Sequence, residues 1–181
     1  MTWLNVIFVG LTILYPFVVY LALGHLEPRI LALILLIVFG MRYLIGRRSA
    51  PRYATWLFIG VASFAIVAFA VGSESTIYYY PVLINVILFV LFGYSIVYPP
   101  SLIERIARLR EPELPPGGIV YTRKVTLVWL GFFVMNGSIA LATAIHGDVA
   151  LWSLYNGLIA YVLMGALFLV ELLIRRQVRG T

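Results

Sequence analysis

The 181-residue chain is 63% hydrophobic and 11% charged, with a net charge of +6 and a mean hydropathy of +1.03. Soluble domains carry roughly 25% charged residues, so this composition excludes an ordinary soluble protein and predicts an integral membrane protein. The absence of cysteine excludes disulfides, thiolate metal sites and cysteine nucleophiles. Apolar segments leave no room for a separate soluble domain, and residues 1–181 are expected to form a single transmembrane domain.

Six apolar segments are long enough to cross a hydrocarbon core, which needs roughly 20 helical residues, with a range of about 17 to 25. Backbone amides in lipid must be satisfied within their own segment, and the alternating pattern of a membrane barrel is not visible. We therefore predict an all-α polytopic membrane protein with a six-helix transmembrane bundle. The predicted spans are Trp3–Leu23, Ile30–Gly46, Tyr53–Val71, Ile77–Tyr98, Val125–Ile145 and Leu151–Ile174.

The first apolar segment has a second interpretation. Ala22-Leu23-Gly24 loosely resembles the small-residue cleavage site of a signal peptide. The apolar run is longer than that of a signal peptide, and no lysine or arginine precedes it. A retained first span is therefore expected.

Basic residues fall on one side of the predicted bundle. Every lysine and arginine except Arg29 lies near the second connection, in the 99–124 loop or on the C-terminal tail. The positive-inside rule then places both termini, the 47–52 loop and the 99–124 loop in the cytoplasm. Because this distribution accounts for the net charge, nucleic acid is not an expected partner.

Aromatic residues near the span ends are typical of anchors at the membrane interface. A ring cage for a ligand is the alternative interpretation. The residues concerned are Trp3, Tyr53, Trp56, Tyr78, Tyr79, Tyr80, Tyr98, Trp129 and Trp152.

The polar loop at residues 99–124 begins with the pattern of a helix start. Ser101 precedes Glu104 by three residues, which is the spacing of a capping box. Apolar residues recur on one face, namely Leu102, Ile103, Ile106 and Leu109, and the other face carries Glu104, Arg105, Arg108 and Arg110. We predict a cytoplasmic amphipathic helix over about 101–111 in the membrane interface, followed by an irregular spacer over Glu113–Gly118.

The predicted loop helix has two possible roles. It packs against the cytoplasmic ends of the bundle, or its arginines Arg105, Arg108 and Arg110 dock lipid headgroups or a partner protein.

Residues of the loop and the last two predicted spans carry a family resemblance. They are Pro100, Leu102, Ile103, Arg105 and Leu114-Pro115 in the loop, Trp129, Phe132-Phe133 and Gly137 in the fifth span, and Trp152 with Tyr155-Asn156-Gly157 in the sixth. In these residues the chain resembles the intracellular septation protein A family of bacterial inner-membrane proteins. It resembles even more closely an uncharacterised group of small membrane proteins associated with aryl-polyene and fatty-acyl synthesis genes.

The resemblance implies a helical bundle in the inner membrane of a Gram-negative bacterium. Its implied role is in envelope maintenance, septation or synthesis of lipid or acyl products, with envelope or acyl-synthesis proteins as partners. It carries over no catalytic residue and no cofactor.

Three asparagines, Asn85, Asn136 and Asn156, lie well inside predicted spans, and the last two each precede a glycine. Polar groups inside a membrane are costly and mark candidate sites. We expect the amides to form hydrogen bonds between helices, with glycine allowing close approach. The alternative is a midplane ligand or headgroup site. Lipid or partner contacts are accordingly assigned to Asn136, Asn156, Tyr155 and Trp129.

Histidines and carboxylates near the predicted outer surface raise the question of a metal or acid-base site. These residues are His25, Glu27, Glu74, His146 and Asp148. No paired-histidine motif is present, so neither a metal site nor a cofactor is predicted.

Three function classes remain. The first is an accessory protein, a monomer or a homo-oligomer, that recruits partners or membrane lipids. The second is a small transporter or flippase for lipids or lipid-linked products, with a polar path formed by the asparagine-bearing spans and by Tyr94, Tyr155 and Tyr161. The third is a membrane-embedded enzyme on acyl substrates, for which no histidine box or activated nucleophile is visible.

Overall fold

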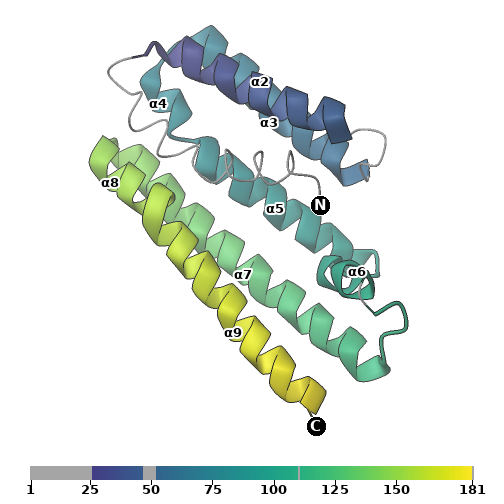
Figure 1. Ribbon diagram of the computed structural model, residues 1–181. Helices are drawn as coiled ribbons and strands as arrows, with labels where there is room; N and C mark the ends of the chain where they lie inside the picture. The colour runs from purple at the N-terminus through teal and green to yellow at the C-terminus, as the bar shows by residue number, and fades with distance from the viewer. Residues whose placement is uncertain (1–25, 47–51, 110, 181) are drawn as a thin grey trace.

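A computed structural model describes residues 26–46, 52–109 and 111–180, and within these ranges it contains helices and no strand (Figure 1). The predicted first span, its alternative signal peptide and Arg110 lie outside the described residues. The long helices are α2 (Pro28–Gly46), α3 (Arg52–Val71), α5 (Tyr80–Val97), α7 (Pro116–His146) and α9 (Ala160–Gly180). The short elements are α4 (Glu74–Ile77), α6 (Leu102–Arg108), α8 (Val149–Ser153) and the π-helical turn η1 (Leu154–Ile159).

The helices lie alongside one another in an elongated bundle. In Figure 1, α2 and α3 form a pair above α5, and α7 and α9 lie on the other side of α5. The short helix α6 lies at the end of the bundle where α5 ends and α7 begins, which is also the end that carries the C-terminus. The elements α8 and η1 lie at the opposite end and lead into α9.

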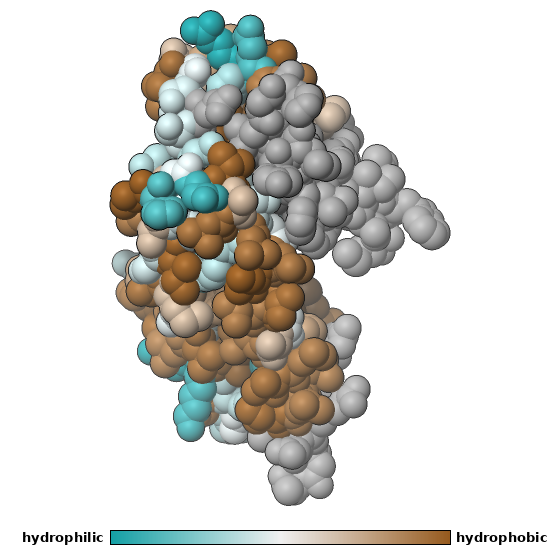
Figure 2. Space-filling model, turned by 90° about the vertical axis from the view of Figure 1, so that its left-hand side faces the viewer, coloured by the Kyte–Doolittle hydropathy of each residue, from teal (hydrophilic) through white to brown (hydrophobic). Residues whose placement is uncertain are grey.

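Three stretches of the described residues are long and apolar enough to cross a membrane, namely Ser75–Val97, Pro116–His146 and Val149–Arg175. Only 11% of the most apolar window in the last of these is buried inside the chain. Apolar surface on this scale, part of which Figure 2 shows in brown, is far more than a soluble protein exposes. The chain is therefore a helical membrane protein. The second and third predicted spans also form helices, α2 and α3.

The predicted break after the fifth span is confirmed. Gly147 ends α7 in the left-handed conformation, with φ +77, and its N–H donates to Thr143 O at 3.2 Å. Glycine adopts this conformation without the steric cost that other residues carry. Asp148 then caps α8, because its Oδ1 accepts a hydrogen bond from Leu151 N at 2.9 Å.

The predicted boundary between the polar loop and the next helix is wrong. The irregular spacer over Glu113–Gly118 ends at Pro115, because α7 begins at Pro116, where a missing N–H removes no helical bond. The carbonyl of Pro115 accepts hydrogen bonds from the next turn, from Gly118 N at 2.8 Å and Ile119 N at 3.1 Å. The predicted fourth span, Ile77–Tyr98, agrees with the membrane-crossing stretch Ser75–Val97. Within this stretch α4 ends at Ile77 and α5 begins at Tyr80, with a proline in its first turn.

A core at the α8 end joins α2, α3, α5, α7 and α8 around Trp152, which is fully buried. Trp152 Nε1 donates to Tyr78 O at 2.9 Å, and the two rings are 5.4 Å apart. Interfacial anchoring is therefore the wrong prediction for Trp152, Tyr78 and Tyr80, which are all buried. Tyr79 and Tyr98 are exposed as anchors would be. The side chains of Trp3, Tyr53 and Trp56 lie outside the described set.

A second core lies nearer the α6 end. Phe92 of α5 packs against Phe132 and Phe133 of α7, with the Phe92 and Phe133 rings 5.0 Å apart. Trp129 packs beside them at 5.7 Å from each of the two α7 phenylalanines. This aromatic block fixes α5 against α7 and holds one face of Trp129 rigidly.

Candidate functional site

The loop helix α6 begins where the capping pattern predicts. Ser101 Oγ accepts a hydrogen bond from Glu104 N at 3.4 Å. A second hydroxyl, Ser95 Oγ of α5, accepts from Leu102 N at 2.9 Å. The Glu104 carboxylate binds Arg108 instead of completing the capping box, with Oε1 at 2.9 Å from Nε and 2.7 Å from Nη2.

The buried face of α6 differs from the predicted one. Ser101, Glu104 and Ala107 are buried, whereas Ile106 is 54% and Leu109 84% exposed. Leu102 and Ile103 do pack against the second core. The face of α6 that carries Glu104 can be buried because the Glu104 carboxylate has Arg108 as its ion-pair partner. Within the described residues α6 packs on the end of the bundle, while two apolar side chains face outward.

The predicted docking arginines hold the loop in shape. Arg105 Nε donates to Pro100 O at 2.8 Å, and its Nη2 donates to Tyr98 O at 3.4 Å. Arg108 donates to Pro112 O at 3.0 Å in addition to its bonds with Glu104. These two guanidinium groups therefore donate to acceptors of the loop itself, namely the Tyr98, Pro100 and Pro112 carbonyls and the Glu104 carboxylate.

The predicted asparagines form hydrogen bonds between helices. Asn136 Nδ2 of α7 donates to Asn85 Oδ1 of α5 at 3.0 Å, and Asn85 Nδ2 donates to Pro81 O at 2.8 Å. Tyr155 OH of η1 donates to Asn136 Oδ1 at 2.9 Å. Gly137 allows this approach, because a Cβ there would lie 3.0 Å from Asn85 Cβ. Three segments thus meet at one buried amide.

Asn156 follows Tyr155 in the π-helical turn and also faces inward. Its Nδ2 donates to Thr143 Oγ1 of α7 at 3.1 Å and to Trp152 O at 2.9 Å. Its Oδ1 is buried with no hydrogen-bond partner among the described residues. A cavity of about 80 Å³ adjoins these amides and is also lined by Tyr161. Tyr94 lies apart from this cluster, on the outer surface of α5 and 60% exposed.

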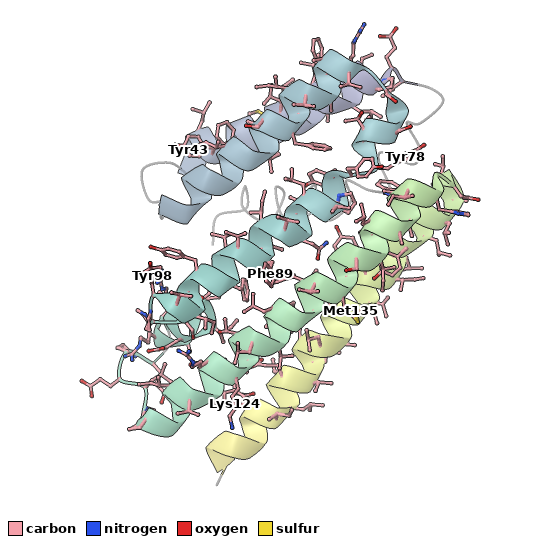
Figure 3. The ribbon with its side chains drawn as sticks, turned by 180° about the vertical axis from the view of Figure 1, so that it is seen from behind. Tyr43, Tyr78, Phe89, Tyr98, Lys124 and Met135 are labelled. Carbon is pink, nitrogen blue, oxygen red and sulfur yellow. The ribbon has the colours of Figure 1, made fainter. Side chains whose placement is uncertain are left out.

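An apolar slot separates α7 from α9 toward the α6 end. Its walls are formed by Val125, Val128 and Trp129 of α7 and by Leu167, Val170 and Ile174 of α9. The slot has a volume of about 180 Å³ and includes Tyr121, Lys124 and Glu171 in its lining. Figure 3 shows Lys124 at the same end of the bundle as Tyr98, with Tyr78 at the opposite end.

A wider, more polar cavity of about 360 Å³ adjoins the slot through Tyr121, which lines both. Its lining includes Glu111, Thr122 and Arg175. At the boundary, Tyr121 OH donates to Glu171 O at 3.2 Å and so connects α7 to α9. An apolar slot next to a charged mouth is the shape that an amphiphile fits.

Sequence reasoning identified Trp129 of this site but missed Tyr121 and Lys124, which line the charged end of the slot. Tyr121 and Lys124 lie in the part of α7 that was predicted to precede the membrane span. The available signal was the run Tyr121-Thr122-Arg123-Lys124, in which aromatic and basic residues adjoin an apolar segment.

Comparison with protein-family models, with curated proteins and with solved structures finds no match to this chain.

Proposed function

We propose that this chain is an accessory protein of the bacterial inner membrane that binds a membrane lipid, with an acyl chain in the slot between α7 and α9. The observation that carries the proposal is the slot itself, which has apolar walls from two helices and charged groups at one end. Acyl chains are the apolar ligands that a bilayer supplies to a slot between two membrane-crossing helices.

The binding free energy of an acyl chain in such a slot has other sources than in a soluble protein. An acyl chain in the bilayer is already in an apolar medium, so transfer into the slot brings little hydrophobic free energy. Attraction must come from close contact with a rigid wall and from the headgroup. Trp129 supplies a rigid wall, because Phe132 and Phe133 pack against it.

The arrangement of α9 supports a ligand at this place. Its preceding turn is bound to α7 through Tyr155 and Asn156. Farther along, the contact of Tyr121 with the Glu171 carbonyl connects the same two helices again. The slot lies toward this second contact, so a chain there fills the space between α7 and α9 without displacing either connection.

The wider role follows from the sequence resemblance. An accessory role in envelope maintenance, septation or synthesis of lipid or acyl products is consistent with a protein that holds a lipid. The positive-inside rule puts the mouth of the slot on the cytoplasmic side. There, the exposed side chains of Ile106 and Leu109 offer an apolar contact for an envelope or acyl-synthesis protein.

Filling the slot tests the proposal. Val170→Trp places an indole between α7 and α9, whereas Val162→Trp places the same group on the outer surface of α9, where valine is similarly exposed. Lipid bound to each purified protein is quantified by native mass spectrometry. We expect Val162→Trp to retain bound lipid like the wild type and Val170→Trp to lose it. Equal lipid occupancy in the two folded variants would reject the slot as the binding site.

A further inference from the structure

The charges around the slot include both signs on facing helices. Lys124 of α7 and Glu171 of α9 line the slot, and Arg175 lines the adjoining mouth. Glu171 and Arg175 are four residues apart and therefore lie on one face of α9. None of these three side chains forms an ion pair within the described part of the chain, where Arg108 and Glu104 do so.

Unpaired charges next to lipid are costly, and a ligand that complements both signs removes that cost. A purely anionic headgroup would satisfy Lys124 and Arg175 but would be repelled by Glu171. A purely cationic ligand would satisfy Glu171 and be repelled by both bases. A headgroup that contains a phosphate and an ammonium avoids both penalties.

We propose that the slot selects a zwitterionic phospholipid, with its phosphate between Lys124 and Arg175 and its ammonium group beside Glu171. This inference rests on the proposed lipid site and specifies its ligand class. The acyl chain of the same molecule lies along Val125, Val128 and Trp129. The bilayer is the source of the ligand, because the slot opens between two membrane-facing helices.

The test compares two lipids that differ only in the headgroup. Wild-type protein is incubated with an equimolar mixture of phosphatidylethanolamine and phosphatidylglycerol with identical acyl chains, and bound lipid is identified by native mass spectrometry. We expect phosphatidylethanolamine to be enriched by about threefold or more, the effect of one partly exposed charge pair. Glu171→Gln, which keeps the side-chain shape, should bring the ratio near one.

Glu113→Gln is the matched control, because Glu113 is exposed and does not line the slot. It should keep the wild-type preference. A wild-type preference for phosphatidylglycerol, no preference, or an unchanged preference in Glu171→Gln would overturn the headgroup assignment. If Val170→Trp still loses lipid in that case, the acyl slot stands and only the headgroup assignment fails. If Val170→Trp retains lipid, both proposals fail.

Discussion

Replacement of Asn136 by leucine removes the amide that joins α5, α7 and η1. The substitution deletes the hydrogen bond to Asn85 Oδ1 and leaves the Tyr155 hydroxyl without its acceptor. Both partners are only 7% exposed, so each loses a hydrogen bond in a largely buried place. Leucine has the same number and branching of heavy atoms as asparagine, so the substitution mainly replaces the polar groups by methyl groups.

The expected decrease in the free energy of unfolding follows from the number of hydrogen bonds lost. Side-chain hydrogen bonds between membrane helices contribute about 0.6 kcal/mol on average and up to about 1.7 kcal/mol. Two such bonds give a loss of about 1–3 kcal/mol for Asn136→Leu. Tyr155→Phe removes only one of them and should cost about half as much. The double variant should cost less than the sum, because both single variants delete the same Tyr155 bond.

Reversible unfolding in mixed detergent micelles measures these free energies. Met135→Leu is the control, since this neighbouring side chain is 47% exposed on the outer surface of α7. It should change the free energy of unfolding by less than about 0.5 kcal/mol. If Asn136→Leu were as stable as Met135→Leu, or if the two single effects were strictly additive, the cluster would not connect the helices as argued.

Two further substitutions, one of them with a matched glycine control, test the packing by the same unfolding assay. Gly137→Ala should destabilise by about 1–3 kcal/mol, because its Cβ would meet Asn85 at 3.0 Å, while Gly131→Ala on the same helix has open space and should be neutral or slightly stabilising. Trp152→Phe should destabilise by about 1–3 kcal/mol, since it leaves the Tyr78 carbonyl without its indole donor; no loss would show that this bond is dispensable.

Local sequence signals predicted the helices and several of their ends. Apolar runs identified the membrane-crossing stretches, because length and composition alone determine whether a helix spans a bilayer. Ser101 and Gly147 were also predictable as ends, since capping and the left-handed conformation depend on a few neighbouring residues. The expectation that amides bond across helices agrees with the contacts of Asn136 and Asn156.

Features that depend on tertiary contacts were not predictable. The sequence pattern placed Glu104 on the solvent-facing side of the loop helix. In the structure the Glu104 side chain is buried, which its ion pair with Arg108 allows. From the sequence, Trp152 was predicted to be an interfacial anchor. In the structure its ring packs against the Tyr78 ring, and its indole N–H donates to the Tyr78 carbonyl. The start of α7 at Pro116 was missed because Pro115-Pro116-Gly117-Gly118 is typical of a loop, although proline fits the first turn of a helix.

The π-helical turn links the buried amides to the proposed lipid slot. A π turn inserts an extra residue into the helical ladder and so changes the face that the following residues present. Here Tyr155 and Asn156 both point inward, and α9 continues beyond them with most of its apolar surface unburied by the chain. The amides thus determine how α9 leaves α7. Loosening the cluster should therefore weaken lipid binding as well as stability, whereas filling the slot should weaken lipid binding alone.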